Sequence, residues 1–324
     1  MASIIKVFGS SSKMKMLNVA RNEFVGAYFA SRPETNATFA ALCELNLSEC
    51  GINPDSCSGL AEFIQSITAP NLILNLNNNP IGAKGMAILS SHVNQETIKT
   101  LYVSNCGLGD DGLQSIIDAC TENRLSGLRV LDASKNGISP KGIQYIASRL
   151  EEGHSCFSQL EELNFASNHL DESSVYSLAK ALEKRRMDGA TALKALDLSE
   201  TNCTVIGAKS IIQMVGLEDL RLFNNDLGNE GFVEIGNVLK GGHSSLKTLD
   251  LGGNRANEAS VASVLQAVSA KEPLENTLKV LVVGGNEGGP IVERMVKEVK
   301  RSHPEIDIAR DRPPREDFAS DLIT

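Results

Sequence analysis

One short pattern of aliphatic residues recurs along this chain of 324 residues and limits its possible folds more than any other feature. In the pattern, leucine or a similar residue stands at positions 1, 4, 6 and 11, and asparagine or cysteine stands at position 9. The clearest copies are LCELNLSECGI from Leu42, LRVLDASKNGI from Leu128, LEELNFASNHL from Leu160 and LEDLRLFNNDL from Leu217. A recurring unit of this kind predicts one stacked, repetitive architecture rather than several independent globular domains.

Weaker copies complete the series and bring it to ten units; they begin at Met14, Asn71, Ile98, Leu193, Leu246 and Leu278. We call position 9 the ladder position; it recurs about every 29 residues, which is typical of the long, helix-bearing class of leucine-rich repeat. Its occupants in the ten units are Asn22, Cys50, Asn79, Cys106, Asn136, Asn168, Thr201, Asn225, Asn254 and Asn286.

Each unit is expected to fold as a strand, a turn and a helix. Segments after the strands, such as GIQYIASRL and SVYSLAKAL, carry apolar residues at helical spacing. The prediction is an α/β leucine-rich-repeat solenoid, a horseshoe over residues 1–310 with parallel strands on its concave face and helices on its convex face. Residues 311–324, which include DRPPREDFASDLIT, are expected to form a disordered tail.

The ladder residue has a predicted structural role. Where the chain leaves each strand, backbone polar groups turn inward, and a buried asparagine amide can both donate to and accept from them. Cysteine can fill the same position with a weaker donor. We therefore expect Asn136→Ala or Asn168→Ala to reduce stability more than a change at the exposed Lys184.

Some segments depart from the regular pattern. The unit from Leu193 has either Thr201 or a bulged Asn202 at its ladder position and predicts a short helix, because the ladder residues there are closer together. The charged stretch EKRRMDG before this unit is expected to be a solvated loop. SIIKVF near the start resembles the end of an earlier helix, which suggests a longer stack or an atypical cap, whereas IVERMVKEVKRS and PEIDIA predict a final helix and a closing strand.

Composition excludes several kinds of function. The chain has 31 Lys and Arg residues against 40 Asp and Glu residues, and this net charge of -9 argues against a nucleic-acid ligand. No stretch has the length and apolarity of a secretory signal or a membrane span. The seven cysteines are odd in number and lie within the repeats, which favours reduced thiols and a cytoplasmic location.

No catalytic or metal site can be identified from the sequence. The five histidines are scattered, without the spacing of metal ligands. Glycine clusters such as GGNRAN and GGNEGG match no phosphate-binding loop and fall where the repeats turn. We therefore expect no cofactor, no metal and no enzymatic activity.

The concave face is the predicted binding surface, since positions 3, 5 and 7 of each strand point away from the helices. Tyr102, Arg221 and Phe223 are expected to protrude there, and we expect them to contact a protein partner together with the three aspartates Asp132, Asp197 and Asp250. In alternative interpretations, Arg221 only neutralises Asp197 and Asp250 on neighbouring strands, and Phe223 only makes a shielded contact with nearby side chains.

LNVARNEF, TFAALCELNLSECGI, LDASKNGISPKGI and LDLSETNCTV resemble the solenoid of the CARMIL family, the linkers of actin capping protein, Arp and myosin-I. This resemblance implies a scaffold for actin assembly, with actin-assembly factors as partners, but the family's lipid-binding, dimerising and capping-protein segments are not recognisable here. The repeat class and LGNEGFVEIGNVL also resemble Ran GTPase-activating proteins, which would imply an action on Ran, although their acidic C-terminal tract is missing. A generic binder like tropomodulin or ribonuclease inhibitor is a third alternative.

Overall fold

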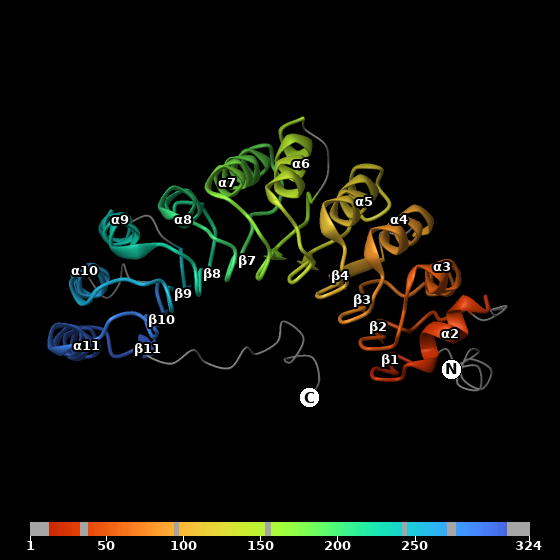
Figure 1. Cartoon of the computed structure of the whole chain (residues 1–324), viewed down its shortest axis with the longest axis horizontal. Helices are drawn as coiled ribbons and strands as arrows, with labels where there is room; N and C mark the ends of the chain where they lie inside the picture. The colour runs from red at the N-terminus through yellow and green to blue at the C-terminus, as the bar shows by residue number, and fades with distance from the viewer. Residues whose placement is uncertain are drawn as a thin grey trace. The chain divides into compact units, whose positions relative to one another are not determined.

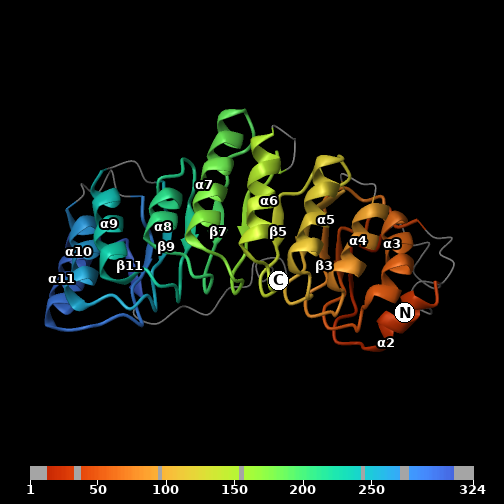
Figure 2. The ribbon, with the colours of Figure 1, turned by 45° about the horizontal axis from the view of Figure 1, so that its top comes forward.

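The predicted solenoid fold is confirmed by a computed structural model, which describes residues 13–32, 38–93, 97–152, 157–241, 245–270 and 277–309. Strands and helices alternate along the chain, and within each of its two units the strands pair in parallel with their neighbours in chain order. The chain divides into two units, residues 1–202 and residues 203–324. In each unit the helices cover one face of the strands (Figure 1) and run side by side (Figure 2). We call the opposite face of the strands the strand face.

The described residues of the first unit form seven strands and the helices that follow six of them. Its strands are β1 (Met16–Asn18), β2 (Glu44–Asn46), β3 (Leu72–Asn75), β4 (Ile98–Tyr102), β5 (Val130–Asp132), β6 (Glu162–Asn164) and β7 (Ala195–Asp197). Its helices are α2 (Phe24–Ala30), α3 (Cys57–Gln65), which a short 3₁₀ turn precedes, α4 (Gly82–His92), α5 (Gly109–Thr121), α6 (Pro140–Glu151) and α7 (Glu172–Met187).

The second unit continues the same alternation. Its strands are β8 (Asp219–Arg221), β9 (Thr248–Asp250), β10 (Val280–Val282) and β11 (Asp307–Ala309). Its helices are α8 (Val205–Ile212), α9 (Gly228–Lys240), α10 (Glu258–Ser269) and α11 (Pro290–Ser302). PEIDIA therefore does contribute a closing strand, and the helix after Thr201 is short, as the spacing predicted.

The core of each unit lies between the strands and the helices. Positions 4 and 6 of the strands, such as Leu45 and Leu47, are fully buried there. Three phenylalanine rings fill the core near the start of the first unit, where Phe63 packs 5.6 Å from Phe29 and 5.3 Å from Phe39 between ring centroids. Each coil thus buries its apolar residues against its neighbours, as expected for a repeat that is unstable alone.

The expectation of a solvated loop at EKRRMDG is wrong for most of that segment. Residues up to Met187 form the last turns of α7, and Arg185 is only 5% exposed. Its guanidinium donates hydrogen bonds to the backbone carbonyls of Phe157, Leu160 and Thr191. The charge pattern misled because a long Arg side chain can extend inward and pair carbonyl groups where the coil closes.

At the irregular repeat, Thr201 is buried in the ladder position and Asn202 is exposed. The Thr201 hydroxyl donates to the carbonyl of Leu198, 2.6 Å away. SIIKVF and the tail 311–324 lie outside the described residues.

Candidate functional site

Backbone groups inside each turn are held by the ladder side chains. In the first unit, Asn136 Oδ1 accepts from the amides of Cys106 and Leu108 in the preceding coil, at 3.0 and 3.2 Å. Its Nδ2 donates to the carbonyls of Val103 and Ser134, at 2.8 and 3.0 Å. The remaining ladder asparagines with an acceptor contact to the preceding coil are Asn79, Asn168, Asn225, Asn254 and Asn286.

Two ladder positions hold cysteines, whose thiols replace only the donor half of the amide. Cys50 Sγ donates to the carbonyl of Val19 at 3.2 Å, and Cys106 Sγ donates to that of Leu76 at 3.2 Å. Burial raises the pKa of the Cys106 thiol to about 12, and also that of Cys57, a buried thiol at the start of α3. These thiols therefore stay protonated at neutral pH and are poor nucleophiles.

Because the pKa values of these buried thiols are raised, we expect the stability of the protein to decrease at alkaline pH. Unfolded thiols ionise near pH 9, whereas the buried ones hold their protons up to about pH 12, so the free energy of unfolding should decrease as the pH rises through this window. We expect a lower urea midpoint at about pH 10.5 than at about pH 8. Cys57→Ala should show a smaller decrease; an equal decrease would assign the alkaline loss to other groups.

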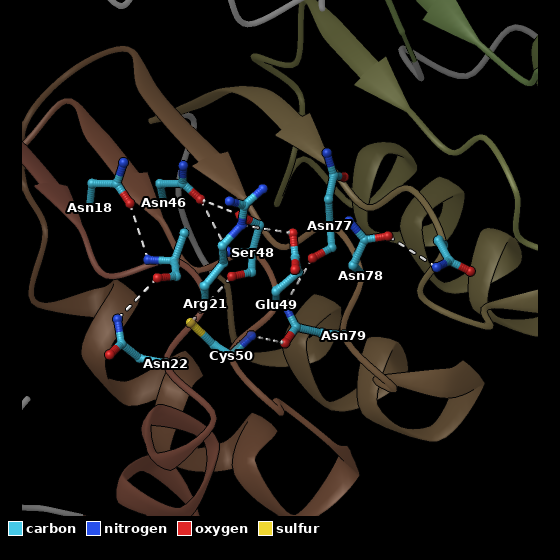
Figure 3. A network of polar contacts seen from close by, with 12 residues as sticks. Asn18, Arg21, Asn22, Asn46, Ser48, Glu49, Cys50, Asn77, Asn78 and Asn79 are labelled. Atoms are coloured by element: carbon cyan, nitrogen blue, oxygen red, sulfur yellow. Dashed lines mark hydrogen bonds and ion pairs between the residues drawn. The ribbon is translucent and has the colours of Figure 1, made fainter.

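Position 5 of the strands holds a row of side chains that form the turn after each strand. In seven coils an Asn or Asp Oδ1 accepts from the backbone amide two residues later, as Asn46 does from Ser48 at 3.1 Å (Figure 3). The other six are Asn18, Asn75, Asp132, Asn164, Asp197 and Asp250. This side-chain-to-backbone turn explains why the row is polar and mostly small.

The three predicted partner-binding aspartates belong to this row, which gives them a structural role. Asp132 is half-buried, whereas Asp197 and Asp250 are buried. Their carboxylates accept from the amides of Ser134, Ser199 and Gly252 at 2.9, 2.8 and 2.9 Å. A partner could reach Asp132 most easily; contact with any of the three stays a prediction.

Tyr102 does not protrude, contrary to the expectation from the sequence. It is 4% exposed, and burial raises the pKa of its phenol well above the usual range, with further contributions from the charges of Glu162, Asp132 and Glu44. In this coil Asn77 of the preceding coil accepts from the Ser104 amide, at 2.7 Å. The sequence pattern could not show that neighbouring strands bury this ring.

Arg221 and Phe223 lie on the strand face of the second unit, and both are half-buried. Arg221 donates from Nε and Nη2 to the carboxylate of Asp219, two residues earlier, at 3.2 and 3.0 Å. Asp219 faces the same side of β8 as Arg221, because residues two apart on a strand share a face. The Phe223 ring lies against Gly252, where a Cβ atom would be 2.9 Å from ring atom Cδ2.

No group of three or more His, Cys, Asp or Glu side chains in the described part of the chain could hold a metal ion. None of the described helices is long and apolar enough to cross a membrane. On the strand face of the second unit, polar turns surround Arg221 and Phe223.

Known proteins with similar sequences share the repeat. A leucine-rich-repeat family model matches residues 94–116. Ribonuclease inhibitor from Sus scrofa is 25% identical over 223 residues, which are 68% of this chain and 47% of that protein. CARMIL from Dictyostelium discoideum is 26% identical over 231 residues, 67% of this chain and 20% of that protein. RAN GTPase-activating protein 2 from Arabidopsis thaliana is 27% identical over 142 residues, which are 43% of this chain and 25% of that protein.

The chain has the fold of a leucine-rich-repeat solenoid and is similar in sequence to ribonuclease inhibitor. It spans about half the length of the ribonuclease inhibitor that it matches and a smaller share of the other two relatives. Leucine-rich repeats suggest a protein-binding scaffold, because their rigid stacks present preformed surfaces. The relatives differ in what their names say they do, so they do not identify the partner of this leucine-rich-repeat protein.

Proposed function

We propose that this protein is a non-catalytic scaffold that binds a protein partner through the strand face of its second unit, at Arg221 and Phe223. The glycines at position 7 of the next two strands, Gly252 and Gly284, support the proposal. Because these glycines have no side chains, they leave space next to the Phe223 ring in which side chains of a partner can pack. Aromatic and arginine side chains are the types most enriched where binding energy concentrates.

The test replaces both residues by alanine. We expect the double variant, Arg221→Ala with Phe223→Ala, to bind a partner at least about tenfold more weakly, because two anchors of this type each contribute about 1 kcal/mol or more. Affinity is measured by biolayer interferometry, and the thermal midpoint shows whether the fold survives.

A matched control exists on the helix side of the first unit. There the ammonium of Lys180 lies 5.7 Å from the ring centroid of Tyr176, which is also partly exposed. Tyr176→Ala with Lys180→Ala again removes an aromatic ring and a cation. If this control loses as much affinity as the double variant, the binding site is elsewhere.

For the partner we propose a factor of actin assembly in the cytoplasm. The match to CARMIL over 67% of this chain supports this choice, together with the resemblance of the irregular Thr-Asn-Cys turn. Purified capping protein, Arp complex and myosin-I are the probes to immobilise. Absence of binding to all three would reject the actin role but not the scaffold.

A second candidate is a GTPase-activating protein for Ran, favoured by the match to RAN GTPase-activating protein 2. Under this alternative the chain would accelerate GTP hydrolysis by purified Ran. A rate unchanged by added chain would exclude it.

A further inference from the structure

Helix α11, the last among the described residues of the second unit, has a buried apolar side and a basic exposed side. Val292, Met295, Val296 and Val299 face the core. Four cations lie on the opposite side and are all exposed, and we call them the basic stripe: Arg294, Lys297, Lys300 and Arg301. At 3.6 residues per turn, Arg294, Lys297 and Arg301 follow one line along the helix.

Unlike many other helical cations, these four have no carboxylate partner among the residues that the structure describes. Arg186 pairs with Glu183 at 2.6 Å, and Lys209 pairs with Glu234 at 2.6 Å. On α11 the two acidic residues are each one turn from cations of the stripe, Glu293 from Lys297 and Glu298 from Arg294 and Arg301, and they offset half of its charge. With four cations against two carboxylates, α11 still has an excess of positive charge on a chain whose net charge is -9.

The dimensions of the basic stripe restrict its ligand. From Arg294 to Arg301 the helix rises about 10 Å, close to the Debye length of about 8 Å at physiological salt. Carboxylates spread over about four residues of extended chain would match this distance. A longer polyanion would bring its remaining charges close to a protein surface that is acidic on the whole.

Two other anionic ligands fit less well. Single-stranded nucleic acid uses aromatic platforms for its bases, and α11 contains no aromatic residue. A membrane-bound amphipathic helix inserts its apolar side, but that side of α11 is already buried in the core. We propose that the basic stripe binds a short acidic segment of a protein partner, at a site separate from the strand face and independent of the function proposed above.

The experiment measures binding of a fluorescent peptide of about four glutamates to the full chain by anisotropy. Binding should weaken as salt rises from about 50 to 300 mM. Arg294→Gln, Lys297→Gln and Arg301→Gln together should weaken binding about tenfold, because each exposed charge contributes modestly. Lys297→Glu alone should give a loss in the same direction, and circular dichroism verifies folding.

The control replaces three exposed lysines elsewhere, Lys84→Gln, Lys141→Gln and Lys240→Gln, and changes the net charge equally. It should bind the peptide like the unchanged chain. Equal weakening in the control and stripe variants would overturn the proposal, and so would absence of peptide binding. Tighter binding of an oligothymidine of similar charge, or of vesicles rich in phosphatidylserine, would also overturn it.

Discussion

Replacing Asn168 by alanine is expected to lower the free energy of unfolding by about 3 kcal/mol. Its Oδ1 accepts from the amides of Asn136 and Ile138 at 3.0 and 2.9 Å, and its Nδ2 donates to the carbonyls of Ala133 and Phe165 at 3.1 and 2.8 Å. Alanine would leave four backbone groups unpaired in a site that water does not reach. Urea unfolding followed by circular dichroism measures the change.

Asn22 provides the matched control, since it occupies the same ladder position in the first coil. It is exposed and donates from Nδ2 to the carbonyls of Val19 and Ala20, but no amide in the described part of the chain donates to its Oδ1. Asn22→Ala should therefore cost less than about 1 kcal/mol. Equal losses from the two variants would show that the ladder amide does not act by pairing buried groups.

Gly59→Ala is the second change with a large expected effect, again about 3 kcal/mol or more. Gly59 lies in α3 where this helix passes the end of α2. A Cβ atom at this position would lie 2.1 Å from the carbonyl oxygen of Phe29. That oxygen belongs to the backbone and cannot rotate away, so the two coils would have to separate and lose packing around the phenylalanine cluster.

Gly288→Ala tests whether the loss comes from the close approach of the two coils. No atom outside its immediate chain neighbours lies within 4 Å of a Cβ built at Gly288. We expect the thermal midpoint of this variant to stay near that of the unchanged protein, whereas Gly59→Ala should lower it by several degrees. A midpoint for Gly59→Ala equal to that for Gly288→Ala would mean that the two coils separate at little cost.

These contacts also bear on the proposed functions. The ladder and the turn-forming row fix the backbone that carries Arg221 and Phe223, so under the proposed function a partner would bind a rigid surface with little loss of entropy. Binding at the basic stripe of α11, in contrast, is expected to depend on the charges of its exposed side chains. Salt should therefore weaken binding at the stripe more than binding at Phe223, where buried apolar area contributes most.

The sequence alone determined the repeat, the ladder positions, the short helix before Leu217 and the closing strand at PEIDIA. This was possible because every coil must place its aliphatic residues and its ladder side chain at equivalent positions to pack against the next coil. Exposure was decided only by the tertiary structure. Tyr102 was expected to protrude and is buried, and Arg185 was expected in solvent and pairs carbonyls inside the coil.

The physical reason is that periodicity gives the direction in which a side chain points. It does not show how far the side chains of the neighbouring strands extend and cover it. Tyr102, Asp219 and Arg221 all point to the strand face by the rule of alternation. Whether each one reaches a partner depends on the side chains of adjacent strands, which are about 30 positions away in the sequence and 4.8 Å away in the sheet. Local sequence therefore specified the fold and the face of the sheet to which each side chain points. Packing between coils decided which of these side chains are accessible.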